Sequence, residues 1–175
     1  GAPQTREQDV TKTSVLFVCL GNICRSPVAE GVFRDLVAQA GLADRIEIDS
    51  AGTGDWHIGR GPDPRSCAVA ARHGIDITGL RARQLCRADF ARFRFIVAMD
   101  ASNLADIRAV APAGHSAEVR MLLDFVPGME GRPVPDPYYG GPEDFEETYR
   151  LARLGCEALL ETVRAALAVG AAAEA

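Results

Sequence analysis

Two short stretches of this 175-residue chain are almost wholly apolar, V-L-F-V-C at residues 15–19 and F-R-F-I-V-A-M at residues 93–99. A strand that is apolar at nearly every position must be covered on both faces, which is typical of parallel strands between layers of helices. Further strands are expected over residues 45–50 and 118–125. Helical patterns lie between these segments, so the order of elements predicts an α/β fold with right-handed crossovers.

The helix after the first apolar run is expected to start with Ser26 as N-cap and Pro27 at the first helical position. It is expected to span residues 27–40. Its apolar face is expected to comprise Val28, Val32, Leu36 and Ala40. Further helices are predicted over residues 67–73, 102–110 and 145–167.

Length and composition predict one globular domain. The chain is 47% hydrophobic and 25% charged, which are ordinary values for a domain of this size. We expect a single domain over residues 14–169, preceded at residues 1–13 by a disordered extension or a cloning remnant and followed at 170–175 by a C-terminal tail. The net charge of -5 argues against nucleic acid or an anionic membrane as the main partner.

The chain shows no sign of export or membrane insertion. Residues 1–13 lack the apolar core of a signal peptide, and the apolar run at 15–20 is too short to span a bilayer. Five cysteines are an odd number in a chain long enough to fold without disulfides, so a secreted disulfide framework is not expected. These features favour the cytoplasm.

The first apolar run ends on Cys19, within C-L-G-N-I-C-R. In α/β sheets, ligands bind at the carboxyl ends of strands, where a loop enters a helix. Gly21 permits a tight turn and Asn22 tolerates a left-handed conformation, so that backbone N–H groups can surround an anion. Arg25 adds a planar fork that matches phosphate oxygens. Because the same positive environment stabilises a thiolate, the segment predicts a phosphate cradle that contains a nucleophile.

A second Cys-x5-Arg segment, C-R-A-D-F-A-R from Cys86 to Arg92, serves as a control. It contains no glycine, no strand leads into it, and Asp89 would repel an anion. Cys86 is therefore expected to be a packed side chain. The spacing alone would also allow Cys19 to be a buried, inert cysteine, but the strand, the glycine, the asparagine and the capped helix favour the functional interpretation.

Four segments of the chain resemble, in order, those of the low-molecular-weight protein tyrosine phosphatases, and the chain is similar to a bacterial-type member of that family. The four segments are V-L-F-V-C-L-G-N-I-C-R-S-P-V-A-E, D-S-A-G-T-G-D-W-H-I-G, R-H-G-I and V-P-D-P-Y-Y-G-G-P-E-D-F. The resemblance implies a three-layer sandwich with a four-stranded parallel sheet, the flavodoxin-like phosphatase fold. It also implies hydrolysis of phosphotyrosine in proteins through a phosphocysteine, without a cofactor or a metal, by a monomer or weak homodimer.

The resemblance assigns roles to individual residues. Cys19 matches the nucleophile, Arg25 the phosphate-binding arginine and Asp136 the general acid and base. The residue whose hydrogen bond steadies the thiolate corresponds to Ser26. The phosphate loop corresponds to Leu20, Gly21, Asn22, Ile23, Cys24 and Arg25. The network that holds this loop corresponds to Asn22, Ser50 and His73, and the aromatic walls to Trp56, Tyr138 and Tyr139.

Several of these residues also have simpler interpretations. Without the resemblance, Asp136 before a proline is a turn residue, and His73 before a glycine caps a helix end. Trp56 could fill the core, although its loop setting favours a binding role. Asp100 could pair with Arg25, or it could cap the helix that follows, as could Ser102.

Two rival functions share this architecture. A thiol-dependent arsenate reductase would need further cysteines to relay a disulfide from Cys19, and Cys86 is a conceivable first relay. A phosphate- or flavin-binding module would need no cysteine.

Cys24 is expected either to trap an oxidised Cys19 as a disulfide or to pack under the helix. The cysteine and histidine spacings argue against a zinc site.

Overall fold

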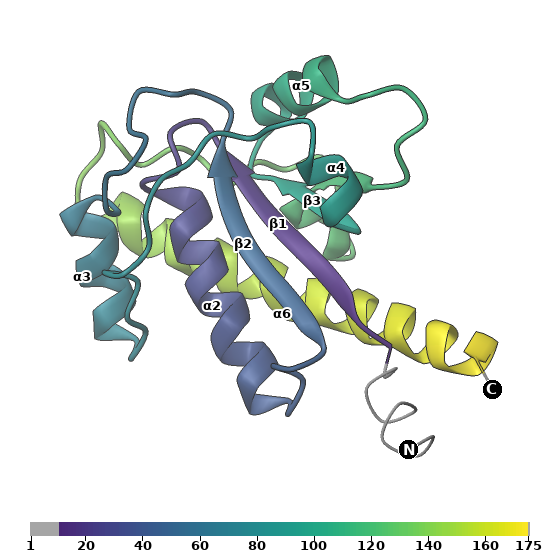
Figure 1. The fold of residues 1–175 in the computed structure, drawn as a ribbon. Helices are drawn as coiled ribbons and strands as arrows, with labels where there is room; N and C mark the ends of the chain where they lie inside the picture. The colour runs from purple at the N-terminus through teal and green to yellow at the C-terminus, as the bar shows by residue number, and fades with distance from the viewer. Residues whose placement is uncertain (1–10, 175) are drawn as a thin grey trace.

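A computed structural model of the protein describes residues 11–174 and contains a four-stranded parallel sheet with the strand order β2-β1-β3-β4 (Figure 1). The strands are β1 Thr13–Cys19, β2 Ile46–Gly52, β3 Phe95–Ala98 and β4 Glu118–Met121. This order is that of flavodoxin-like folds, in which the chain passes to opposite sides of β1 and leaves a ligand site between the diverging connections. The predicted fold class is confirmed.

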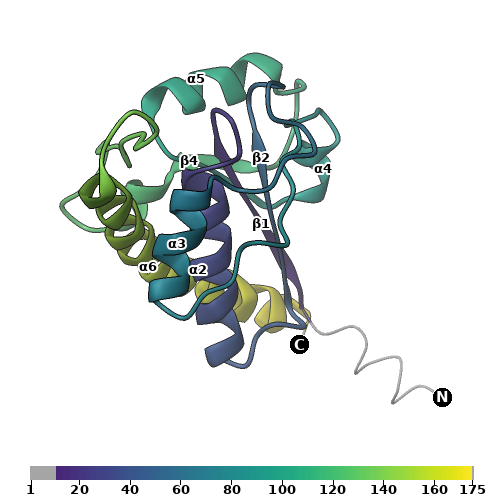
Figure 2. The same ribbon diagram turned by 90° about the vertical axis from the view of Figure 1, so that its left-hand side faces the viewer.

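Helices cover both faces of the sheet. They are α2 Arg25–Gln39, α3 Pro64–Arg72, α4 Asp89–Arg92, α5 Ala101–Val110 and α6 Pro142–Glu174, with a 3-10 helix, η1, at Leu122–Phe125. Helices α2, α3 and α6 lie together on one side of the sheet, whereas α4 and α5 lie on the other (Figures 1 and 2). Within the described residues, none of these helices has the length and apolar character that crossing a bilayer requires.

The first strand shows why its sequence is apolar throughout. Val15 and Phe17 pack into the core beneath α2 and α6, whereas Leu16 and Val18 point to the core beneath α4 and α5. All four side chains are fully buried. Because successive side chains of a strand point to opposite faces, a strand between two helix layers has no position for a polar residue.

Several predicted boundaries are wrong, among them the start of α3, which is Pro64 instead of residue 67. Helix α2 begins at Arg25, so Ser26 lies in its first turn and is not the N-cap. Strand β4 ends at Met121 instead of continuing to residue 125, because residues 122–125 form η1, where Asp124 accepts a hydrogen bond from the Met121 N–H. Helix α6 begins at Pro142 and continues through Glu174, so it extends past both predicted ends, at residues 145 and 167, and through most of the segment expected to be a C-terminal tail. The expectation for the N-terminal extension falls on residues 1–10, outside the described residues.

The loops that follow β1, β2 and β3 meet at the carboxyl end of the sheet, where α5 also lies (Figures 1 and 2). The loop after β2 is joined to the loop after β1, because the N–H groups of Thr53 and Gly54 donate to the carbonyls of Cys19 and Leu20, both at 2.9 Å. The Val134 N–H donates to the Met99 carbonyl at 2.8 Å and brings the segment before α6 to the same place. Distant parts of the sequence therefore converge around Cys19.

Candidate active site

The loop between β1 and α2 has the conformation expected of a phosphate cradle. Asn22 has a φ of 57°, the only positive value at a non-glycine residue in the described part of the chain. The loop backbone lies against Gly52, where an added Cβ would be 2.8 Å from the Leu20 carbonyl oxygen. No side chain caps the N-terminus of α2, so its first N–H groups remain available for an anion.

A chain of hydrogen bonds connects the Cys19 sulfur to the protein interior. Cys19 Sγ lies 3.0 Å from Ser26 Oγ, which accepts a hydrogen bond of 2.8 Å from Asn22 Nδ2. Because Ser26 Oγ accepts from Asn22, its own hydrogen is free to point at the sulfur. Asn22 Nδ2 also donates to Ser50 Oγ at 3.0 Å, and Ser50 Oγ donates to Glu30 Oε1 at 2.7 Å. Ser26, which was expected beside the sulfur, and Asn22 and Ser50, which were expected in the network that holds the loop, are thus joined by one chain of hydrogen bonds.

Arg83, which sequence reasoning missed, completes this network from outside the loop. Its backbone N–H donates to Asn22 Oδ1 at 3.1 Å. Its guanidinium donates to Asp49 at 3.0 Å and to both carboxylate oxygens of Asp89 at 2.9 and 3.1 Å. The side chain therefore fixes the backbone that holds Asn22. The alternating R-A-R pattern carried no signal for this function, because the contact joins residues 61 positions apart.

Arg25 is held in place by contacts from two segments, the end of β3 and the loop before α6. Its side chain is 3% exposed. Nη1 donates to Asp100 Oδ2 at 2.6 Å and to the Val134 carbonyl at 3.0 Å, and Nη2 lies 3.7 Å from Asp136 Oδ2. Asp100 also caps α5 by accepting a hydrogen bond of 2.7 Å from the Asn103 N–H. Both interpretations of Asp100 are therefore correct, since each carboxylate oxygen has its own partner.

These groups line a cavity of about 320 Å³. Cys19 lies almost fully buried in its lining, and the cavity is bordered by the aromatic side chains that the sequence singled out. The lining residues are Cys19, Leu20, Gly21, Ile23, Cys24, Arg25, Trp56, His57, Asp136, Tyr138 and Tyr139. Asp136 is 44% exposed, and its Oδ1 accepts a hydrogen bond of 3.1 Å from the Tyr138 N–H. A thiol, a guanidinium, a carboxyl group and three aromatic rings thus share one cavity.

Two further residues, one in the lining of the cavity and one against an aromatic ring of that lining, were missed by sequence reasoning. His57 lies in its lining beside Gly21, and its Nδ1 has no hydrogen-bond partner among the described residues. Its position directly after Trp56 was the available signal. Arg65 lies outside the cavity, with its guanidinium 5.5 Å from the centre of the Tyr138 ring and 4.6 Å from that of Phe145. A cation over an aromatic face is attractive, so Arg65 supports Tyr138 from behind.

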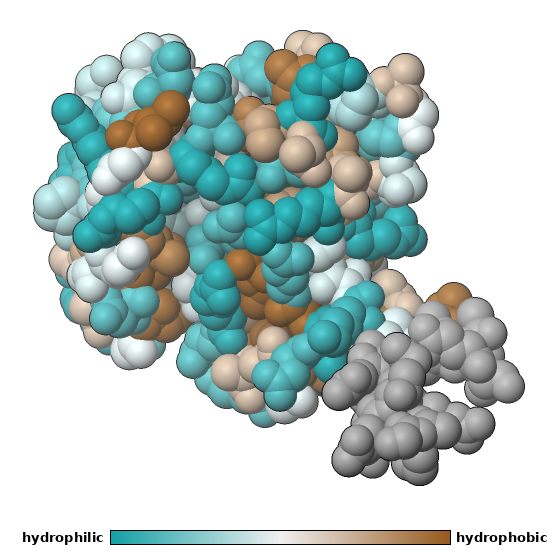
Figure 3. Space-filling view, viewed as in Figure 1, coloured by the Kyte–Doolittle hydropathy of each residue, from teal (hydrophilic) through white to brown (hydrophobic). Residues whose placement is uncertain are grey.

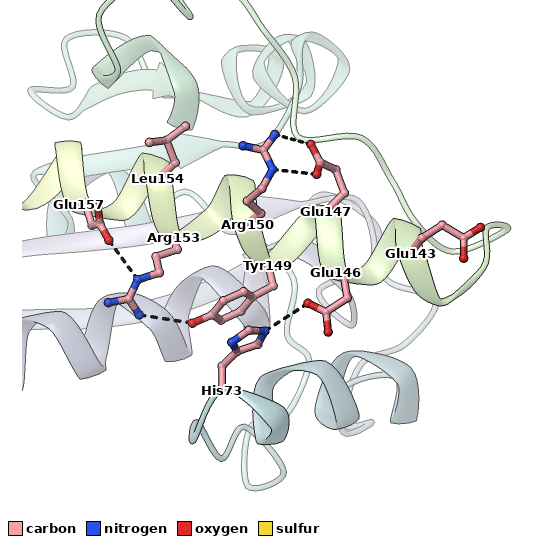
Figure 4. Close-up of a pocket in the computed structure, with 9 residues that line it drawn as sticks. All are labelled: His73, Glu143, Glu146, Glu147, Tyr149, Arg150, Arg153, Leu154 and Glu157. Atoms are coloured by element: carbon pink, nitrogen blue, oxygen red, sulfur yellow. Dashed lines mark hydrogen bonds and ion pairs between the residues drawn. The ribbon is translucent and has the colours of Figure 1, made fainter.

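The predicted location of His73 is wrong. His73 lies at the C-terminal end of α3, where its ring stacks on Tyr149 with 3.7 Å between ring centres and its Nε2 lies 3.1 Å from Glu146 (Figure 4). These contacts join α3 to α6. Among the described residues, the side chains that Asn22 and Ser50 contact are Ser26 and Glu30, and His73 is not one of their partners. Within the network, the position that sequence reasoning gave to His73 is occupied by Glu30.

The other cysteines differ from Cys19 in their surroundings. Cys86 is exposed, so the expectation of a packed side chain is wrong. The buried charged group in that segment is Asp89, which accepts a hydrogen bond from the Cys86 N–H at 2.8 Å. Burial raises the pKa of the Cys24 thiol to about 12, so Cys24 is protonated at neutral pH. In the part of the chain that the structure describes, no cluster of His, Cys, Asp or Glu side chains is arranged to hold a metal ion.

Comparisons with known proteins agree with this architecture. The sequence model of the family described as "Low molecular weight phosphotyrosine protein phosphatase" matches residues 14–169. The low molecular weight protein-tyrosine-phosphatase YfkJ of Bacillus subtilis is 47% identical over 151 residues, which cover 86% of this chain and 96% of that protein.

Solved structures show the same fold. The crystal structure of YfkJ has a TM-score of 0.82 at 45% identity and covers 88% of this chain and 96% of its own. The structure of a drosophila arginine phosphatase has a TM-score of 0.79 at 33% identity, with 85% and 96% of the two chains covered. The match to the family model spans the cradle, the cavity and the whole sheet, and the chain therefore belongs to the low molecular weight phosphotyrosine protein phosphatase family.

Proposed function

We propose that this protein hydrolyses phosphotyrosine in proteins through a phosphocysteine intermediate, with Cys19 as the nucleophile and Asp136 as the general acid and base. The observation that carries this proposal is the cavity that Cys19, Arg25 and Asp136 line together with aromatic side chains, with Arg25 and Asp136 3.7 Å apart. Each of the three groups corresponds to a requirement of phosphate monoester hydrolysis. The family to which the chain belongs supports the same reaction.

In the first step, the thiolate of Cys19 attacks phosphorus, an S–P bond forms and the bond from phosphorus to the phenolic oxygen breaks. The Ser26 hydroxyl, oriented by Asn22, donates to the sulfur and steadies the thiolate. The Arg25 guanidinium and the N–H groups of the loop receive the phosphate oxygens, where charge develops in the transition state. Asp136, in its protonated form, donates a proton to the departing phenolate.

In the second step, water attacks the phosphocysteine. Asp136, now a carboxylate, accepts a proton from this water, the P–O bond forms, and the S–P bond breaks to regenerate the Cys19 thiolate. Inorganic phosphate is then released. Asp136 is suited to both steps because its half-exposed carboxylate lies at the cavity within 3.7 Å of Arg25, near the position where the leaving oxygen and the water would lie.

The aromatic lining favours a phenolic substrate. Trp56 and Tyr138 are 65% and 38% exposed and border the same cavity, and exposed apolar side chains that gather around one hollow mark a ligand-binding groove. An aromatic ring between them would bury apolar area on both faces. We further infer that the protein is cytoplasmic and is a monomer or weak homodimer. All five cysteines are unpaired, which supports a reducing compartment.

Turnover of para-nitrophenyl phosphate and of a phosphotyrosyl peptide, with phosphoarginine and arsenate as parallel substrates, tests this proposal. We expect hydrolysis of the first two in the presence of EDTA. Cys19→Ser should abolish turnover yet retain binding of the phosphopeptide, because the cradle is unchanged. Preferential hydrolysis of phosphoarginine, consumption of thiols with arsenate, or turnover by Cys19→Ser would each contradict the proposal.

A further inference from the structure

A second groove lies beside the active-site cavity and shares two walls with it. The groove has a volume of about 300 Å³, and Leu20 and Trp56 border both hollows. On its far side the groove is lined by Ala109 and Val110 of α5, and Leu85 is also part of its lining. It is therefore continuous with the rim over which a protein substrate must lie.

The walls of this groove are unusually apolar for an exposed surface. Seven large apolar side chains are exposed among the described residues, and three of them, Leu20, Trp56 and Val110, border the groove. Two others, Tyr138 and Tyr139, border the active-site cavity. The face shown in Figure 3 is mostly hydrophilic, with apolar residues in separate spots. The exposed apolar area thus extends from the active site toward α5.

The groove carries one charged residue. Asp106 of α5 is exposed, and within the described residues no ion pair or hydrogen bond involves its carboxylate. No lysine or arginine lines the groove, and the Gln84 amide donates to the Thr53 carbonyl at 3.2 Å. Apolar walls beside an unpaired carboxylate match the arginine side chain, whose methylene groups can lie against apolar surface while its guanidinium pairs with an acid.

We propose that this groove binds an arginine side chain of the substrate protein, located within a few residues of the phosphotyrosine. The inference rests on the proposed function, because the phosphotyrosine in the active-site cavity is what places the neighbouring residues over Leu20 and Trp56. An extended chain advances about 3.3–3.6 Å per residue, so residues one to three positions away reach the rim. The arginine methylenes lie between Trp56 and Val110, and the guanidinium pairs with Asp106.

The test uses phosphotyrosyl peptides that differ only at positions one to three residues from the phosphotyrosine, with arginine, leucine or glutamate placed on either side. The value of kcat/KM for each peptide is divided by that of the same enzyme for para-nitrophenyl phosphate, which does not reach the groove. Binding to the Cys19→Ser variant is measured in parallel by fluorescence polarisation. Asp106→Asn and Asp106→Arg test the carboxylate, and Asp44→Asn removes an exposed carboxylate next to the amino end of β2 as a matched control.

At one position or more we expect the arginine peptide to be favoured over the glutamate peptide by about two- to fivefold, the range of a solvent-exposed ion pair. Asp106→Asn removes this preference, Asp106→Arg reverses it, and Asp44→Asn leaves it unchanged. The proposal would be overturned by any of three results. The normalised kcat/KM could be the same for all peptides, or leucine could be favoured as much as arginine and independently of Asp106, or the preference for arginine could survive in Asp106→Asn. Failure of the proposed function is distinguishable, because it abolishes turnover of para-nitrophenyl phosphate, while the binding ratios still report on the groove.

Discussion

Replacement of Asn22 tests whether the cradle depends on this one side chain. The asparagine makes three hydrogen bonds, to Ser26, Ser50 and the Arg83 N–H, while its backbone has a φ of 57°. In Asn22→Ala the loss of three bonds at about 1 kcal/mol each lowers the free energy of unfolding by roughly 3 kcal/mol. An alanine in the left-handed conformation costs about 1–2 kcal/mol more.

Asn22→Gly separates the two contributions. Glycine loses the same three hydrogen bonds but adopts the positive φ without strain, and its greater freedom in the unfolded chain costs only about 0.4–1 kcal/mol. We therefore expect the glycine variant to be less stable than the parent but about 1 kcal/mol more stable than the alanine variant. Both variants should lose about 10²-fold in kcat, because Ser26 is no longer oriented toward the sulfur.

Urea unfolding, followed by circular dichroism, measures these differences from the midpoints, provided that the slopes agree. Turnover of para-nitrophenyl phosphate measures the effect on the site. If Asn22→Ala were as stable as the parent, or if it were more stable than Asn22→Gly, the hydrogen bonds or the backbone strain would have been assigned wrongly. Full activity in either variant would show that the network does not orient the nucleophile.

Three further predictions concern single side chains. Asp136→Ala should lower kcat by roughly 10²-fold or more for phenyl phosphate but much less for an ester whose phenolate leaves unaided, and a uniform loss across a leaving-group series would contradict an acid. Brief peroxide treatment should inactivate the enzyme reversibly through a disulfide between Cys19 and Cys24. After this treatment the Cys24→Ser variant should regain less activity with a thiol reductant than the parent does. If both regain the same activity and mass spectrometry finds no peptide that links Cys19 to Cys24, Cys24 is a packing residue. Burial opposes ionisation of Asp89, but the hydrogen bonds from Arg83 and the Cys86 N–H outweigh this effect and lower the pKa of Asp89 below its ordinary value of 3.8. The ionised Asp89 therefore stabilises the fold above pH 3.8, and this stabilisation is lost as the pH falls through the lowered pKa. Asp89→Asn should therefore flatten the acid side of the stability profile, and an unchanged profile would argue against this pairing.

The sequence by itself determined the alternation of strands and helices and the loop that leads from Cys19 to Arg25. These features depend on residues close together along the chain, where the alternation of a strand or the order of strand, loop and helix is directly visible. The apolar run to Cys19, the turn at Asn22 and the helix that carries Arg25 all follow from such local patterns. The position of the helix start, by contrast, was missed by two residues, because Ser26 contacts Cys19 instead of capping α2.

Only the tertiary structure decided which distant residues hold the site together. Asn22 meets the Arg83 backbone, 61 positions away, a contact that no sequence pattern indicated. Arg25 pairs with Asp100 at a separation of 75, which the sequence left open as one of two interpretations. His73 was placed wrongly for the same reason, since α3 turns it toward α6 and away from the cradle. A hydrogen bond depends on the distance between two groups and on their relative direction. For residues on different elements, the packing of the helices on the sheet determines that distance and direction. No local pattern in the sequence records this packing.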